Sequence, residues 1–299
     1  MAITSYRDVK VADPRGALRS RVQRVIREFS GRAGVNAHNL TTGETFDING
    51  GVVFPTLSCI KLAIMVELFW QFHEGRLRLD EKITIQNSDI RGGTGVLRDL
   101  TPPIQLTLRD ICMLMVTVSD NTATWIISEK VGHANVNKRM RSLGFKTMEL
   151  RSDLSLKTFS QIHRLDIDAY AVSSPADLTS LITLVATGKA PAKKECDQIL
   201  AMMRLCQGVD YLGRYLPINE FIPESKITPE AILANKIGAY LHGRADVGLV
   251  ETKNVRYTIT VMTDKSKDKS LILPVHEGTE AVGRISKAVY DAWTSPVKR

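Results

Sequence analysis

The 299-residue sequence has no long, uncharged apolar run. Its longest apolar stretch, Leu57 to Phe72, contains Lys61 and Glu67, whereas a membrane-spanning helix needs about 18 or more apolar residues with few or no charges. The stretch from Met1 to Gly16 carries charges from Arg7 onward and lacks the apolar segment of a secretory signal. We therefore expect no contact with a membrane and a cytoplasmic location, unless the sequence is the mature form of a secreted protein.

Cysteine is scarce, and its spacing excludes two kinds of site. The four cysteines, Cys59, Cys112, Cys196 and Cys206, form no C-x-x-C pair of the kind found in zinc and redox sites. In a chain of this length they also do not form the framework of a small disulfide-rich domain. We expect free thiols, and no residue spacing implies a metal or a cofactor.

Positive charge is in excess but is not concentrated. The net charge is +8, yet lysine and arginine are scattered, and Lys265, Lys267 and Lys269 alternate with Ser and Asp. A nucleic-acid-binding face clusters its basic residues, so we interpret this segment as a solvated loop and expect no nucleic-acid partner. The expected partner is a small molecule, and the expected oligomeric state is a monomer.

The composition is that of an ordinary globular protein, with 43% hydrophobic and 24% charged residues. Apolar spacing predicts a helix over Leu18 to Phe29, and alternation broken at Thr42-Gly43 predicts a hairpin over Val35 to Ile48. The middle of the chain is predicted to be helical over 57–72, 108–118, 122–131, 133–143, 175–187 and 197–205. Strands are predicted over 234–240, 246–251 and 257–263, followed by a helix over 280–293.

Strands at both ends of the chain, around a helical middle, predict an α/β fold. A hairpin cannot bury its faces alone, so the first two strands are expected to join the later ones. We expect an antiparallel sheet of about five strands, built from both chain ends and flanked by helices, plus an all-helical lobe. Residues 1–54 and 206–299 would form the sheet lobe, residues 55–205 the helical lobe, and the active site would lie in the cleft between them.

The strongest chemical signal is the segment from Phe54 to Lys61, where a loop enters the long apolar helix. Ser58 and Lys61 are three residues apart, which places both side chains on one helical face. A serine needs a base to become a nucleophile, and a buried lysine beside another cation can lose its proton and act as that base. The S-x-x-K spacing is common by chance, so it requires support from elsewhere in the chain.

Two further segments supply that support. Ser119-Asp120-Asn121 lies between two predicted helices, where it forms a short turn or caps the second helix. Lys236-Ile237-Gly238-Ala239 begins a predicted strand, which in isolation is an ordinary strand start. A lysine at a strand edge and a serine on a turn become informative when they accompany a candidate nucleophile.

Together and in this order, the three motifs resemble those of class A β-lactamases and penicillin-binding proteins. The segments Gly92 to Asp99 and Leu106 to Asp110 also look like the family's sequence between the first two motifs. The glycine-rich run at 92–95 is not followed by the Gly-Lys-Ser/Thr of a phosphate-binding loop, so we interpret it as a structural turn. The resemblance covers roughly Val22 to Trp293 and implies a β-lactamase/transpeptidase-like fold.

The resemblance implies a set of catalytic roles. Ser58 would attack a carbonyl, Lys61 is the candidate base, and Ser119 would relay a proton between Lys236 and the leaving group. The backbone N–H groups of Ser58 and Ala239 would form the oxyanion hole, where one donor typically contributes about 3–4 kcal/mol. Cys59, next to the nucleophile, points about 100° away around a helix and is expected to be buried and inert.

The resemblance also implies substrate contacts, one of which is altered here. Asn121 would bind the acyl amide of the substrate, Asp120 would stabilise its turn, and Gly238 would let the substrate approach the strand. Ile237 stands where the family has a Thr or Ser whose hydroxyl helps hold a substrate carboxylate. Arg244 is the candidate replacement for that contact, although an arginine at a surface turn is the alternative interpretation.

A second departure concerns the water-activating glutamate of class A β-lactamases. Its Arg-x-Glu-Pro setting is missing here, and the alignment of the preceding segment places Leu154 at the glutamate position. By comparison with the family, the loop that follows is longer than usual and lacks the charged pair that normally joins its ends. Asp153, Asp166 and Asp168 are the candidate replacement bases; otherwise deacylation relies on Lys61 or is slow.

We therefore expect a serine acyl hydrolase that cleaves a lactam, amide or ester through an acyl-enzyme on Ser58. One alternative is a true class A-type β-lactamase with a displaced deacylation base. A second is a D,D-peptidase-like penicillin-binding protein, and a third is a binding module that has lost catalysis. Two lysines that converge on one serine argue against the last, because a binding module has no need of them.

Overall fold

The structure is a computed structural model that describes residues 16–151, 170–218, 229–270 and 276–295. Its centre is a five-stranded antiparallel sheet in the order β2-β1-β10-β9-β8. As predicted, both ends of the chain contribute: β1 (Arg32–Asn39) and β2 (Thr45–Ile48) come from the beginning, and β8 (Ala231–Tyr240), β9 (Gly243–Thr252) and β10 (Arg256–Asp264) from the end. Strand β8 is an edge strand, so one of its sides is available to the rest of the site.

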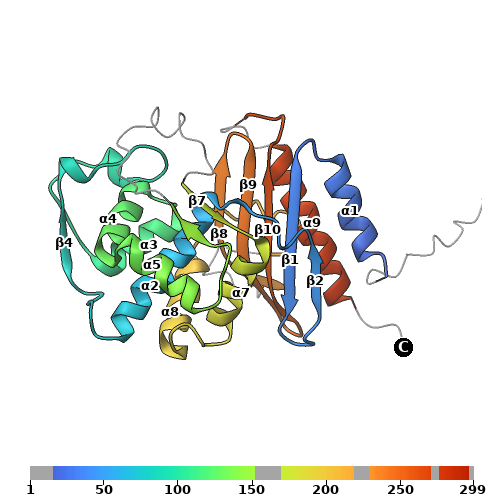
Figure 1. The fold of residues 1–299 in the computed structure, drawn as a ribbon, viewed down its shortest axis with the longest axis horizontal. Helices are drawn as coiled ribbons and strands as arrows, with labels where there is room; N and C mark the ends of the chain where they lie inside the picture. Colours follow the sequence, from blue (N-terminus) through green and yellow to red (C-terminus); the bar gives the residue numbers. More distant parts are fainter. Residues whose placement is uncertain (1–15, 152–169, 219–228, 271–275, 296–299) are drawn as a thin grey trace, which may run out of the picture.

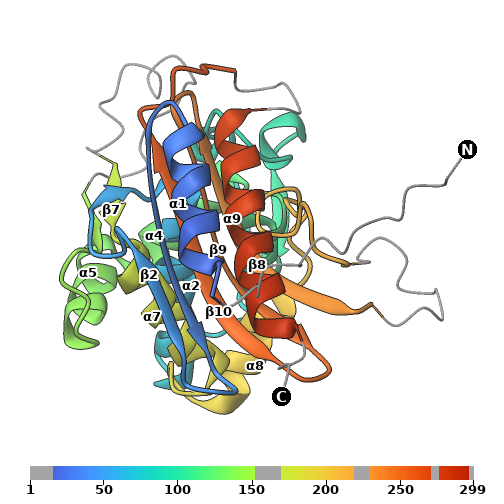
Figure 2. The same ribbon diagram turned by 90° about the vertical axis from the view of Figure 1, so that its right-hand side faces the viewer.

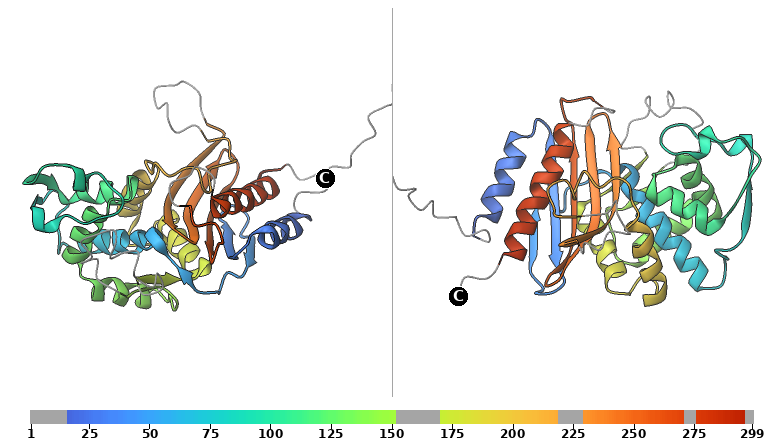
Figure 3. Two further views of the ribbon diagram at one scale, coloured as in Figure 1. Left: turned by 90° about the horizontal axis from the view of Figure 1, so that it is seen from above. Right: turned by 180° about the vertical axis from the view of Figure 1, so that it is seen from behind.

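Helices cover both faces of this sheet (Figures 1 and 2). One face carries α1 (Leu18–Glu28) and α9 (Glu277–Thr294), which lie side by side. On the other face, α7 (Pro175–Ala186) contacts β1, β9 and β10, and α8 (Lys193–Met203) contacts β8. The layers are seen from above in Figure 3.

The middle of the chain is mainly helical, as predicted, and also contains short strands. Its helices are α2 (Lys61–His73), α3 (Leu108–Thr117), α4 (Asn121–Val131), α5 (His133–Ser142), α7 and α8 (Lys193–Met203), with short 3₁₀ turns η1 (Leu57–Ile60), η2 (Asn87–Asp89) and η3 (Leu97–Asp99). Strands β4 (Lys82–Ile85) and β5 (Ile104–Thr107) pair with each other, and β3 (Phe54–Pro55), β7 (Ala171–Ser173) and β6 (Glu149–Leu150) form a second small sheet. These strands are too short to give a clear alternating pattern, which is why the sequence did not predict them.

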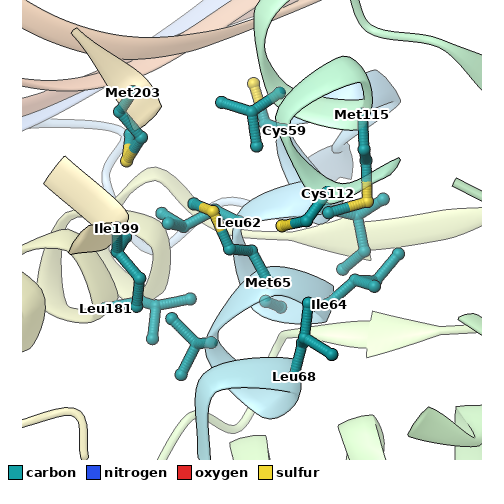
Figure 4. Close-up of a cluster of buried hydrophobic side chains, with 14 of the residues drawn as sticks. Cys59, Leu62, Ile64, Met65, Leu68, Cys112, Met115, Leu181, Ile199 and Met203 are labelled. Atoms are coloured by element: carbon teal, nitrogen blue, oxygen red, sulfur yellow. The ribbon is translucent and has the colours of Figure 1, made fainter. Parts of the chain in front are cut away.

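Helix α2 runs through the larger hydrophobic core and is buried on nearly every side (Figure 4). Its two charged residues are buried for different reasons. Glu67 is 1% exposed and accepts hydrogen bonds from Gln71 (2.8 Å) and Arg139 (2.9 Å), so its charge is paired. Lys61, also 1% exposed, donates to Ser119 O, in the turn between α3 and α4. A second core lies between the sheet and helices α1 and α9.

Within the described part of the chain, no helix has both the length and the apolar character needed to cross a bilayer. The four cysteines are all buried free thiols, as expected. The division into a sheet lobe (1–54 and 206–299) and a helical lobe (55–205) stays a prediction, although α7 of the latter packs directly on the sheet.

Candidate active site

Ser58 lies on a tight turn between β3 and α2. The predicted helix over 57–72 is α-helical only from Lys61, and residues 57–60 form the 3₁₀ turn η1. Residues three apart are eclipsed in a 3₁₀ turn, so Ser58 and Lys61 still share one side. Leu57, directly before Ser58, is held at φ +52°, a left-handed conformation that a branched side chain rarely adopts. The surrounding structure therefore fixes the direction of the turn that carries Ser58.

Strand β8 lies directly against this turn, and Gly238 makes the approach possible. A Cβ atom added to Gly238 would lie 2.7 Å from the Leu57 Cβ and 2.8 Å from the Ser58 nitrogen. Such contacts are too short for any side chain other than hydrogen. The glycine predicted to admit substrate therefore also allows the turn that carries Ser58 to pack against β8. This packing brings the Ser58 N–H next to Gly238, one residue from Ala239.

The second motif forms the sharp turn between α3 and α4. Ser119 adopts a left-handed φ of +57°. The carboxylate of Asp120 caps α4 by accepting a hydrogen bond from Ala123 N (2.9 Å), and it also accepts from Val96 N (2.7 Å) and Leu97 N (2.9 Å). Asp120 therefore stabilises the turn, as expected, and its donors come from two segments.

The glycine-rich segment is part of the same arrangement. Asn121 N donates to Thr94 O (2.9 Å), and the Thr94 hydroxyl donates to Ser119 O (2.8 Å). Gly95 has φ +119°, and a Cβ there would lie 2.3 Å from the Asp120 carboxyl carbon. The segment is a structural turn, as expected, and Thr94 is a supporting residue that sequence reasoning missed. The adjacent glycines were its only signal.

Two lysines converge on the hydroxyl of Ser119. Lys61 Nζ lies 3.0 Å from Ser119 Oγ and also donates to Ser119 O (2.7 Å) and Asn121 Oδ1 (3.1 Å). Lys236 Nζ donates to the same Ser119 Oγ at 3.1 Å, and to Ile237 O at 2.8 Å. The structure thus brings together residues from α2, the α3–α4 turn and β8.

Burial weakens the hold of both lysines on their protons. Both side chains are 1% exposed. Burial lowers the pKa of Lys61 well below its usual value, and the positive charge of Lys236 lowers it further. Burial also lowers the pKa of Lys236. A general base must be able to lose its proton, so the larger downward shift favours Lys61 over Lys236 for that role.

The remaining side chains of the third motif, those of Ile237 and Ala239, differ in their surroundings. Ala239 is exposed on β8. The Ile237 side chain lies against Gly208, where an added Cβ would be 2.3 Å from Ile237 Cδ1. Ile237 therefore has a packing role against the segment between α8 and β8.

Arg244 is not the surface-turn arginine of the alternative interpretation, because it is only 2% exposed. Its guanidinium donates to the carbonyl oxygens of Tyr240, Gly243 and Ser270, the last two at 2.8 Å. It thus ties the β8–β9 turn to the segment after β10. A role in binding a substrate carboxylate stays a prediction, and it would require this arginine to give up main-chain partners.

Two other expectations concern the cysteine next to Ser58 and the candidate deacylation bases. Cys59 is fully buried, its Sγ lies 3.1 Å from Lys236 O, and burial raises the pKa of its thiol, which fits the inert thiol expected. The candidate bases Asp153, Asp166 and Asp168 lie outside the described residues.

Comparison with known proteins places this arrangement in a family. The family described as "Beta-lactamase enzyme family" matches residues 17–293. Among curated relatives, the β-lactamase PSE-4 of Pseudomonas aeruginosa is 30% identical over 123 residues, which cover 41% of this chain and 42% of PSE-4. The matched part of the chain thus spans less than half the length of that relative.

Solved structures match over nearly the whole chain. The β-lactamase from Sphaerobacter thermophilus DSM 20745 is 26% identical, with a TM-score of 0.81, over 94% of this chain and 99% of that one. A leucine-to-glutamate variant of PBP-A, solved as an acyl-enzyme complex with penicillin G, is also 26% identical, with a TM-score of 0.78, over 93% and 96% of the two chains. The β-lactamase/transpeptidase-like fold expected from the motifs is confirmed, and the chain belongs to the β-lactamase enzyme family.

Proposed function

We propose that the protein is a serine hydrolase that cleaves a lactam, amide or ester bond through a covalent acyl-enzyme on Ser58. The observation that carries this proposal is the Ser119 hydroxyl, which lies 3.0 Å and 3.1 Å from two buried lysine nitrogens. Burying one ammonium is unfavourable, and burying two around one hydroxyl is more so. Such an arrangement fits a site that transfers protons through the Ser119 hydroxyl.

Acylation begins with the transfer of the Ser58 proton to neutral Lys61. The Ser58 Oγ attacks the substrate carbonyl, and the resulting negative oxygen is stabilised by the N–H groups of Ser58 and Ala239. Lys61 then returns the proton through Ser119 Oγ to the leaving nitrogen or oxygen as its bond to the carbonyl carbon breaks. This route differs from the resemblance-based expectation, in which Ser119 relays a proton between Lys236 and the leaving group, because Lys61 holds the abstracted proton and also lies 3.0 Å from Ser119 Oγ. In the proposed route Lys236 stays protonated, and its hydrogen bond orients Ser119 for the transfer.

Deacylation requires a water molecule and a second base. The sequence places Leu154 where class A β-lactamases have their glutamate, and the three candidate aspartates are unproven. The relative PBP-A was captured as a penicillin G acyl-enzyme in a leucine-to-glutamate variant. We propose that acylation by penicillins is the faster step here, so that the acyl-enzyme accumulates.

The test is intact-protein mass spectrometry over time, after mixing with penicillin G, a chromogenic cephalosporin or an activated ester. A β-lactam adduct that is absent from Ser58→Ala is expected, and its decay should be slower than its formation. Formation of an adduct in Ser58→Ala, or the absence of both an adduct and a hydrolysed product with all three reagents, would refute the serine mechanism. Rapid turnover without accumulation would instead indicate a β-lactamase in which another residue replaces the glutamate.

A gain-of-function variant tests the deacylation step separately. Leu154→Glu supplies a carboxylate at the aligned position, and we expect it to shorten the lifetime of the penicilloyl-enzyme. Leu154→Gln is the matched control, because it has similar size and polarity without a basic carboxylate. Equal lifetimes in the two variants would show that the alignment at this position is wrong.

A further inference from the structure

A buried carboxylate that the mechanism above does not use lies directly behind Lys236. Asp246, on β9, is fully buried, and Asn235, on β8, is 1% exposed. Asp246 Oδ2 accepts from Leu212 N (3.0 Å) and from Asn235 Nδ2 (2.9 Å), and Asn235 also donates to Gly208 O (2.9 Å). An uncompensated buried carboxylate is costly, so its presence in the middle of a sheet requires an explanation.

The strand register places this carboxylate close to Lys236 but on the other face of the sheet. Asp246 pairs with Ile237, and side chains of directly paired residues point to the same face. Lys236, one residue earlier, points to the opposite face and reaches Ser119. The two groups therefore interact through the strand without forming a direct ion pair.

The groups that surround Asp246 leave Lys236 as its main charged neighbour. They are Lys236 on β8, Asp210, Tyr211 and Cys206 between α8 and β8, and Cys59 on η1. Burial raises the pKa of both thiols and of the Tyr211 hydroxyl, which keeps these three groups neutral. Asp210 is exposed, so solvent screens its charge. Arg244, two residues earlier on β9, is bound to main-chain carbonyls.

We propose that Asp246 is a positioning residue that acts through Lys236: its negative charge behind β8 keeps the Lys236 ammonium protonated and donating to Ser119. The inference rests on the proposed function, because that function requires a protonated Lys236. Burial raises the pKa of Asp246 to about 8, against the opposing effect of its N–H donors. The carboxylate therefore gains its full charge at alkaline pH, where Lys236 is closest to losing its proton.

The test is the pH dependence of the acylation rate constant, measured with a chromogenic cephalosporin from about pH 5 to 11, a range that covers the titration of the depressed lysines. In Asp246→Asn, which removes the charge but keeps the shape, the alkaline limb should move down by about one pH unit while the acidic limb stays in place. Asp246→Glu should restore the alkaline limb. Thr179→Val is the control, because it removes a buried hydrogen-bonding hydroxyl whose partners are Asn36 O and Thr260 Oγ1 rather than Asp246. It should lower the melting temperature without moving the limb.

A second measurement does not depend on turnover. The Nζ resonance of Lys236, assigned by its loss in Lys236→Arg, should titrate about one pH unit lower in Asp246→Asn than in the wild type. Coincident titrations, or an equal shift in Thr179→Val, would overturn the inference. If the wild type shows no acylation at any pH, the proposed function fails, while the resonance titration still decides whether Asp246 controls Lys236.

Discussion

The close approach of β8 to the nucleophile turn makes Gly238→Ala a sharp test of the site. The added methyl group would lie 2.7 Å from the Leu57 Cβ, 2.8 Å from the Ser58 nitrogen and 3.1 Å from the Thr56 oxygen. Ordinary contacts between carbon atoms are about 3.5–4.0 Å, so the turn and the strand must separate by close to 1 Å. All three contacts involve backbone or a Cβ atom, which cannot rotate away.

The expected consequences follow from the size of this displacement. Inserting a methyl group into a closely packed site typically costs about 1–3 kcal/mol of stability. A displacement of about 1 Å in a catalytic group can reduce the rate about 100-fold. We therefore expect a folded variant in which acylation by a chromogenic cephalosporin is slower by about two orders of magnitude.

The matched control is Gly248→Ala, on the neighbouring strand β9. Its added Cβ would lie 2.9 Å from Ala234 O and 3.1 Å from Asn235 Cβ, so it is comparably crowded but does not touch Ser58. Stopped-flow acylation and chemical denaturation should show similar losses of stability in both variants, and a large loss of rate only in Gly238→Ala. An acylation rate within threefold of the wild type in Gly238→Ala would show that the contact does not position the nucleophile.

Three further predictions concern single residues. Ser58→Ala should abolish acylation while leaving the melting temperature nearly unchanged, because Ser58 is partly exposed and is not a core residue; a large fall in melting temperature would assign it a structural role. Asp120→Ala removes the acceptor for three backbone N–H groups. It should lower the free energy of unfolding, measured by chemical denaturation, by about 3 kcal/mol or more. A loss below about 1 kcal/mol would show that these hydrogen bonds do not stabilise the turn. Ile237→Thr adds a hydroxyl at the third motif and should raise the ratio of acylation rates, penicillin G over its methyl ester, about 10-fold. Ile237→Val should leave this ratio unchanged. Equal ratios in the two variants would show that this side chain does not reach the substrate carboxylate.

Local patterns in the sequence were sufficient for much of the fold. Apolar spacing located α1, α3, α4, α5, α7 and α9, and alternation located the long strands, because these elements bury one face and their periodicity is recorded in consecutive residues. That the first hairpin joins the later strands followed from the argument that it cannot be stable alone, whereas its pairing through β1 with β10 is seen only in the structure. The short strands β3, β6 and β7 left no such signal, since two or three residues show no period.

The three motifs were also recognisable in the sequence, but their chemistry depends on tertiary contacts. Lys61 and Lys236 meet at Ser119 from positions 58 and 117 residues away, and only the packing of α2, α4 and β8 decides the distances and the burial that lower the pKa of each lysine. The same packing buries Arg244 against carbonyl groups, turns Ile237 onto Gly208 and places Asp246 behind Lys236. A residue's type can be read from the sequence, whereas its solvation and its distant neighbours are properties of the folded chain.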